Sequence, residues 1–238
     1  LTTLNAPYIF RDKRGQALHI APLQYNAVTK TLRTYSSMRL LVSFSGQDPT
    51  NALNLKNNNS SPLFDEIHKA HFINNQPNET TPSEYTAIGD KGSMLVLCPT
   101  KYLPHIKPFV EWKNQKGIPT KLVNVDTISG GPIEDNMRAF VKNYYLSKLN
   151  TFLVIVGNVG DVPTVNQFYT DTSLHGPGDN AYGFINGADH YPEIIVARLM
   201  ARDSNDVKVQ VQKIKKNKKT PNMADSWMRN ITGIASGE

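Results

Sequence analysis

The sequence is poor in cysteine, because Cys98 is its only one. A single thiol excludes an internal disulfide and any metal site built from several cysteines. Cys98 ends the apolar run MLVLC and is followed by proline. Free cysteine is among the most buried residue types, and a catalytic thiol needs a partner base that the sequence around Cys98 does not display. We therefore expect Cys98 to be structural.

Long apolar runs and closely spaced histidine pairs are also missing. No stretch approaches the roughly 20 apolar residues needed to cross a bilayer, so no membrane span is expected. The six histidines include no His-x-x-x-His pair of the kind that binds zinc on one face of a helix. The segment GNVGDVP lacks the third glycine and the lysine of a phosphate-binding loop, so we interpret it as a tight turn.

Positive charge is concentrated in one part of the chain. The net charge is +6, and much of the excess lies in the run KIKKNKK from Lys213 to Lys219. Cations are favoured near a helix C-terminus, so this run is interpreted as the solvated last turns of a helix. Binding of nucleic acid favours basic residues interleaved with aromatics, and the run contains none. No nucleic-acid partner is expected.

Composition divides the chain into three segments. Residues 1–45 are β-rich: alternating apolar side chains from Leu32 to Phe44 predict a half-buried antiparallel strand, and the preceding NAVTK predicts a hairpin turn. Residues 46–92 are rich in Asn, Ser, Pro and Thr, which predicts a linker with one short helix at PLFDEIHKAHFI. Residues 93–238 form the third segment.

In the third segment, strand patterns alternate with helix patterns. Strands are predicted at MLVLC, TKLVNVD, TFLVIVG, EIIVARLMA and RNITGIAS. Three helices are predicted, at YLPHIKPFVEWKNQKG, IEDNMRAFVKNYYLSK and SNDVKVQVQKIKKNKK. The first ends at Gly117, and the third has Ser204 as its N-cap. The second has one apolar face, formed by Met137, Phe140, Val141 and Tyr144. This order predicts an α/β fold whose parallel sheet is covered by helices on both faces.

Two places in this segment are candidates for chemistry. In open α/β sheets function collects at the carboxyl ends of strands, which here are Pro99, Asp126, Asn158 with Asp161, and Ser236 with Glu238. The loop GDNAYGFINGADHYPE also gathers oxygen ligands, namely Asp179, Asn180, Asn186, Asp189 and Glu193. Calcium takes six to eight such oxygens, but the loop lacks the EF-hand spacing, so an Asx-rich turn is the alternative.

Four stretches together resemble one family. They are YLPHIKPFVEWKNQKG, DNAYGFINGADHYPEI, ARLMA and ITGIASGE, and they make residues 85–238 similar to the N-terminal half of the catalytic domain of gingipain-type cysteine endopeptidases, peptidase family C25. The stretch PYIFRDKRGQALHIAPLQYNAVTKTLRTYSSMRLLVSFS resembles the last strands of the gingipain prodomain. The resemblance covers nearly the whole chain and is weakest over residues 46–84.

The resemblance implies a fold and an activity. The fold is a caspase-like parallel sheet sandwiched by helices, of which this chain supplies part, preceded by a β-rich prodomain fragment. The catalytic cysteine and histidine are expected C-terminal of this chain, which alone is expected to be inactive. Glu238 matches the glutamate that orients the catalytic histidine. No cofactor is required for the chemistry.

The resemblance also implies a metal and partners. A structural calcium ion is expected, with Asp189 and Glu193 as ligands. The expected partners are protein or peptide substrates and the protein's own prodomain, at a secreted or cell-surface location.

Two departures from the family pattern keep alternatives open. The third strand ends in VGN where the family often has VGD, which puts an acidic role of Asn158 in doubt. The junction NETTPSEYT contains no Arg or Lys, so self-processing there by a basic-specific protease is in doubt. The alternatives are a non-catalytic C25-like binding or surface-assembly module and a sortase-like C25 peptidase of a secretion system.

Overall fold

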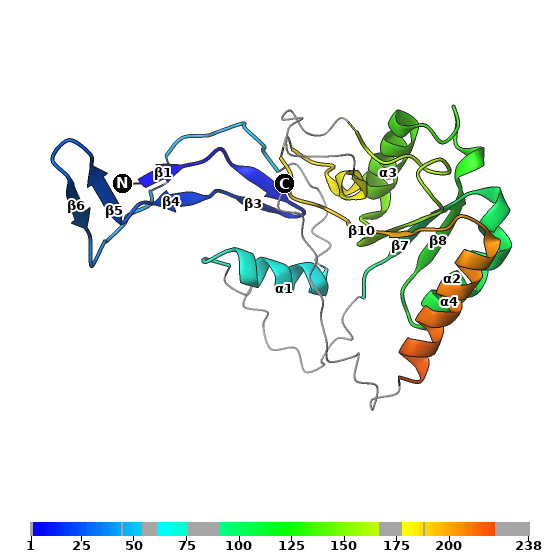
Figure 1. The fold of residues 1–238 in the computed structure, drawn as a ribbon. Helices are drawn as coiled ribbons and strands as arrows, with labels where there is room; N and C mark the ends of the chain where they lie inside the picture. Colours follow the sequence, from blue (N-terminus) through cyan, green and yellow to red (C-terminus); the bar gives the residue numbers. More distant parts are fainter. Residues whose placement is uncertain are drawn as a thin grey trace, which may run out of the picture.

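The computed structural model describes residues 2–43, 45–53, 61–75, 91–166, 178–187 and 189–221. We call residues 2–75 the N-terminal region and residues 91–221 the sheet region. A four-stranded parallel sheet, in the order β10-β9-β7-β8, forms the centre of the sheet region (Figure 1). Its strands are β7 (Met94–Cys98), β8 (Thr120–Asn124), β9 (Phe152–Val156) and β10 (Ile195–Leu199). The predicted parallel α/β sheet is confirmed.

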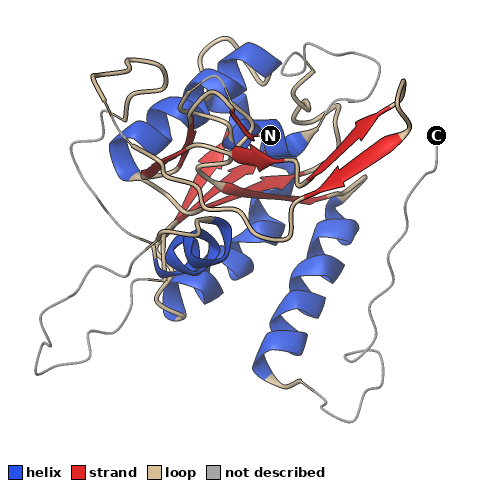
Figure 2. Cartoon of the chain, turned by 90° about the vertical axis from the view of Figure 1, so that its left-hand side faces the viewer, coloured by secondary structure: helices blue, strands red, loops and turns tan. Residues whose placement is uncertain are grey.

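Helices cover both faces of this sheet because its central strands are apolar on both sides. Leu95, Leu97, Leu153 and Ile155 pack with α3 (Glu134–Lys148) in one buried cluster. Their neighbours in the sequence, among them Val96, Cys98, Val154 and Val156, pack with α2 (Leu103–Gln115) and α4 (Ser204–Lys219) in another. Figure 1 shows α2 and α4 side by side, with α3 across the sheet, and Figure 2 shows helices on both sides of the strands.

The helix ends correct two details of the prediction. Gly117 has a positive φ just beyond α2, as expected of a residue that ends a helix. The N-cap of α4 is Asp203, whose carboxylate accepts hydrogen bonds from the backbone of Asn205 and Asp206, so the prediction of Ser204 was wrong by one residue. A carboxylate here also gains from the positive helix N-terminus, which a hydroxyl does not match.

The buried face of α3 is rotated relative to its prediction. Met137, Val141 and Tyr145 are its buried residues, whereas Phe140 and Tyr144 are only partly buried. Tyr145 lies in the last turn, where the N-terminal region packs against α3 through the Arg11 side chain. The helical spacing of apolar residues does not by itself predict that contact.

The described residues of the N-terminal region form three two-stranded antiparallel sheets and one helix. The strand pairs are β1 (Thr2–Leu4) with β4 (Leu18–Ile20), β2 (Tyr8–Phe10) with β3 (Lys13–Gly15), and β5 (Leu23–Asn26) with β6 (Thr31–Thr34). The hairpin turn predicted at NAVTK joins β5 to β6 and is confirmed. The predicted half-buried strand from residue 32 to 44 is wrong: β6 stops at Thr34 and is exposed throughout. No described element covers it, so its alternating apolar residues have nothing to pack on.

Helix α1 (Pro62–His71) forms where the linker was predicted to carry a helix. It packs on β2 in a cluster of Tyr8, Phe10 and Phe64, and Tyr8 stacks on Tyr191 of the sheet region with ring centroids 4.0 Å apart. Three short 3-10 helices complete the fold: η1 (Thr100–Tyr102), η2 (Val125–Thr127) and η3 (Asp179–Gly183). None of the helices in the described ranges has the length and apolar character that a bilayer crossing needs.

Candidate functional site

The carboxyl ends of β7, β8 and β9 carry a connected polar network. The backbone N–H of Thr100 donates to Asp126 (2.8 Å), and Asn124 Nδ2 donates to the Thr100 hydroxyl (2.8 Å). Lys101 Nζ lies 2.5 Å from Asp161 Oδ1. Hydrogen bonds from Thr100 lower the pKa of Asp126. The acids of this edge are therefore held by hydrogen bonds and by a lysine, which suits orientation and charge stabilisation better than proton transfer.

Cys98 ends β7 beneath this network and cannot act as its nucleophile. Its side chain is buried, and its Sγ lies 3.4 Å from its acceptor, the carbonyl oxygen of Pro99. Burial, together with the charges of Asp126 and Asp161, raises the pKa of the thiol to about 12. A thiol in this state supplies almost no thiolate at neutral pH, so Cys98 is structural, as the sequence predicted.

Arg198 of β10 ties the acidic loop to the sheet edge, and the sequence analysis did not single it out. Its Nε and Nη2 donate to the two carboxylate oxygens of Asp179, at 2.7 and 2.6 Å. Its Nη1 donates to the carbonyl oxygens of Gly157, Asn158 and Val162. The signal in the sequence was one arginine inside the otherwise apolar strand EIIVARLMA. Asp179 is thus engaged in a bidentate ion pair, which fixes the start of the loop.

Glu193 is the most buried acid of the loop. Its side chain is fully buried, and Oε2 accepts hydrogen bonds from the backbone of Ile185 (2.7 Å) and Asn186 (3.0 Å). Oε1 makes no hydrogen bond of good geometry, although the Arg11 backbone lies close enough to lower the pKa of Glu193. Burial outweighs these hydrogen bonds and, with the charge of Asp189, raises that pKa to about 7. Glu193 is therefore a carboxyl group whose charged form is disfavoured by its burial.

Asp189 lies where the loop meets the N-terminal region. Its Oδ1 accepts a hydrogen bond from the backbone of Tyr191 (3.1 Å), and its Oδ2 accepts one from the backbone of Ile9 in β2 (2.7 Å). A cavity of about 580 Å³ adjoins it, lined by Asp189, Tyr191 and residues of the N-terminal region such as Asn5 and Asn51. The two predicted calcium ligands lie in the same loop, close enough for the charge of Asp189 to raise the pKa of Glu193.

The described residues contain no group of three or more His, Cys, Asp or Glu side chains that could hold a metal ion. A cation bound by Asp189 and Glu193 needs backbone carbonyls and water for its remaining ligands, a donor set that calcium accepts. The predicted last strand and Glu238 lie outside the described residues.

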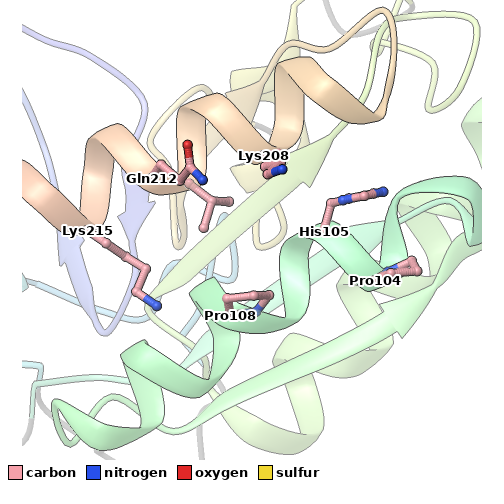
Figure 3. A pocket seen from close by; sticks show the side chains of 7 residues that line it. Pro104, His105, Pro108, Lys208, Gln212 and Lys215 are labelled. Atoms are coloured by element: carbon pink, nitrogen blue, oxygen red, sulfur yellow. The ribbon is translucent and has the colours of Figure 1, made fainter.

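A second cavity, of about 430 Å³, lies between α2 and α4 (Figure 3). Pro104, His105 and Pro108 project from α2, and Lys208, Gln212 and Lys215 face them from α4. Its lining contains no carboxylate, thiol or hydroxyl group. It therefore lacks the groups that peptide-bond chemistry needs.

Comparison with known proteins gives a match for each part of the chain. A model described as peptidase family C25 matches residues 88–238, and one described as the C25 propeptide matches residues 1–80. Gingipain R2 of Porphyromonas gingivalis is 34% identical over 243 residues, which cover 100% of this chain. Lys-gingipain W83 of the same organism is 25% identical over 247 residues, again covering 100% of this chain.

A solved structure named "Structure of Protease" covers 56% of this chain and 29% of its own, with a TM-score of 0.50 and 24% identity. This likeness shows the fold alone. The chain spans 31% of the length of Gingipain R2 and 14% of that of Lys-gingipain W83.

Proposed function

The chain belongs to peptidase family C25, and from this membership we propose that it is part of a gingipain-like cysteine endopeptidase in its zymogen form. The observation that carries the proposal is that a propeptide match and a peptidase match follow one another along the chain without overlap. The finer division of the first part, into strands over residues 1–45 and a linker over residues 46–92, stays a prediction.

The chemistry is the attack of a thiolate on a peptide carbonyl. Cys98 is excluded as the nucleophile because it is buried and its pKa is raised to about 12. Cys98 is the only cysteine of the chain, so the catalytic cysteine is assigned to residues C-terminal of Glu238, and the family resemblance assigns the catalytic histidine there as well. Glu238 is assigned to orient the histidine: a carboxylate on one imidazole nitrogen fixes the tautomer and stabilises the imidazolium formed when the thiol loses its proton.

Substrates, propeptide and location follow from the same assignment. Gingipain-like activity implies protein or peptide substrates and a secreted or cell-surface protein whose own propeptide binds the peptidase part. The contacts between the N-terminal region and the sheet region support that binding. Tyr8 stacks on Tyr191, and the backbone N–H of Ile9 donates a hydrogen bond to Asp189.

A structural calcium ion is part of the proposal, with Asp189 and Glu193 as its carboxylate ligands. The fit rests on Glu193 Oε1, which is buried without a hydrogen bond of good geometry, and on the raised pKa of Glu193. A divalent cation between the two carboxylates would stabilise their charged forms. The ion's role is to fix the loop, while the peptide chemistry belongs to the cysteine, histidine and glutamate.

The departure at Asn158 does not favour a non-catalytic module. Asn158 Oδ1 accepts a hydrogen bond from the backbone N–H of Asp161, and Asp161 Oδ2 accepts one from that of Asn158. The turn thus carries an acid three residues later, paired with Lys101. No specific observation favours a surface-assembly module or a sortase-like peptidase over the endopeptidase.

The test is the hydrolysis of peptide substrates by the full-length protein. We expect Glu238→Ala to lower kcat/KM by roughly 10²–10⁴-fold, the range of a disrupted acid–base partner, and Cys98→Ala to leave it nearly unchanged. Full activity of Glu238→Ala would remove its assigned role. Absence of thiol-dependent hydrolysis in the wild-type full-length protein would remove the endopeptidase and leave the binding module.

A further inference from the structure

Arg11 combines two costly features at one position. It is the first residue of the two-residue loop between β2 and β3, and its φ of 57° lies in the left-handed region that favours glycine. Its side chain is also buried, with an exposed fraction of 3%. Strain and a buried charge persist at one residue only where the surroundings hold it firmly.

The surroundings of the Arg11 guanidinium are backbone carbonyls of the sheet region. Nη1 donates to the carbonyl oxygens of Glu193 (2.6 Å) and Asn150 (3.4 Å), and Nη2 donates to that of Leu149 (3.0 Å). Leu149 caps the C-terminus of α3 in a left-handed conformation, with φ 52°. The guanidinium thus lies at the negative end of the α3 dipole, where a cation is favoured.

Aromatic rings complete the enclosure. The Arg11 Cζ lies 4.5 Å from the ring centroid of Phe64 in α1 and 5.8 Å from that of Tyr145 in α3. Burial lowers the pKa of Arg11, whereas the nearby carboxylates of Asp12, Glu193 and Asp65 act to raise it. A planar group with several donors suits separate carbonyls and a ring face, and an ammonium does not.

We propose that the carbonyls of Leu149, Asn150 and Glu193, with the Tyr145 ring, form a guanidinium socket on the sheet region. The socket holds the N-terminal region through Arg11, and it keeps that region bound after the chain between them is cut. The inference rests on the proposed function only in treating residues 1–80 as removable. It identifies which residue anchors the propeptide and which chemistry recognises it.

The chain supplies a matched control three residues away. Arg14 belongs to the same hairpin, but its side chain is 36% exposed and pairs with Asp48 of its own region at 2.9 Å. Changing Arg14 to lysine makes the same exchange of guanidinium for ammonium in the same hairpin without touching the socket. An effect confined to Arg11 therefore reports the socket and not the exchange of an arginine for a lysine in this hairpin.

The experiment places a recognition sequence for a site-specific protease within residues 81–87 of the full-length protein. After cutting, the dissociation rate of the N-terminal piece is measured from the immobilised remainder. We expect Arg11→Lys to accelerate dissociation roughly 10- to 100-fold, the equivalent of lost charge-assisted hydrogen bonds, and Arg14→Lys to change it less than about 2-fold. Equal rates for Arg11→Lys and wild type would overturn the socket.

A second measurement covers the case in which Arg11→Lys does not fold, as judged by circular dichroism before cutting. Millimolar arginine amide should then speed the dissociation of the cut wild-type protein, and lysine amide should not. No effect of either amide, or an equal effect of both, would contradict a guanidinium site. Because both measurements record binding and not hydrolysis, their failure is distinct from failure of the proposed peptidase.

Discussion

The sheet region and the N-terminal region respond differently to the same kind of sequence signal. In β7 and β9, apolar runs lie on strands whose two faces are covered by α3 and by α2 with α4. In β6, alternating apolar residues lie on an exposed two-stranded ribbon, and Leu32 is 57% exposed. A run of apolar residues predicts a buried strand by itself, whereas alternation predicts burial only where a second layer exists.

A pair of leucine substitutions measures this difference most strongly. Leu97→Ala removes a fully buried side chain of β7 and should lower the free energy of unfolding by about 2–5 kcal/mol, because the packed sheet cannot close the cavity. Leu32→Ala should change it by less than about 0.5 kcal/mol. Denaturant unfolding of both variants gives the two values. Similar losses of stability in the two variants would mean that β6 is covered by a second layer and is not exposed.

Glu193 gives the next largest effect, and it lies where the two regions meet. Because its pKa is about 7 in the folded protein and near 4.5 in the unfolded chain, the folded state holds the extra proton between these values. The contribution of Glu193 to the free energy of unfolding should therefore be greatest below pH 4.5. It should fall as the pH rises through 7 and level off above that, with a total loss of up to about 3 kcal/mol.

The measurement is the free energy of unfolding against pH, with EDTA present. Glu193→Gln should flatten this dependence, and Ile185→Val provides a control that keeps the carboxylate. Calcium should restore stability to the wild type at pH 8 and leave Glu193→Gln unchanged. Two results would contradict the assignment of Glu193. One is a wild-type stability that rises between pH 4.5 and 7 and loses that rise in Glu193→Gln. The other is an equal stabilisation of both proteins by calcium.

The smallest expected effect concerns the N-terminus of α4. Asp203→Ala removes a carboxylate that accepts two backbone hydrogen bonds and should lower the free energy of unfolding by about 1 kcal/mol. Ser204→Ala should cost less than about 0.5 kcal/mol, since its hydroxyl does not cap the helix. Thermal and denaturant unfolding can rank the pair. A larger loss for Ser204→Ala would restore the cap predicted from the sequence.

The strands and the helices of the sheet region could be predicted because their signals are local. Met94–Cys98 and Phe152–Val156 are continuous apolar runs, and Gly117 marks a helix end. What could not be predicted depends on contacts between distant residues. Arg198 donates hydrogen bonds to Asp179 and to the carbonyl oxygen of Gly157. Arg11 donates a hydrogen bond to the carbonyl oxygen of Glu193, and its guanidinium lies near the ring of the buried Tyr145. None of these partners is a neighbour in the sequence.

The candidate site was predictable to the same extent. The sequence placed Asp126 and Asp161 at strand ends and Asp189 with Glu193 in one loop. In the structure Asp126 and Asp161 bind the neighbouring residues Thr100 and Lys101, and the charge of Asp189 acts on Glu193. The burial of Glu193 was not predictable, because it depends on the N-terminal region and on the backbone of residues 185 and 186. The role of Glu238 rests on the family pattern.

The most direct test of the account is to find which cysteine of the full-length protein reacts with a peptidyl thiol-reactive probe. Mass spectrometry of the labelled protein should locate the probe on one cysteine C-terminal of residue 238, with Cys98 unlabelled because it is buried and its pKa is about 12. Labelling should fall in the Glu238→Ala variant. Labelling of Cys98, or of no cysteine at all, would contradict the assignment of this chain to an active cysteine endopeptidase.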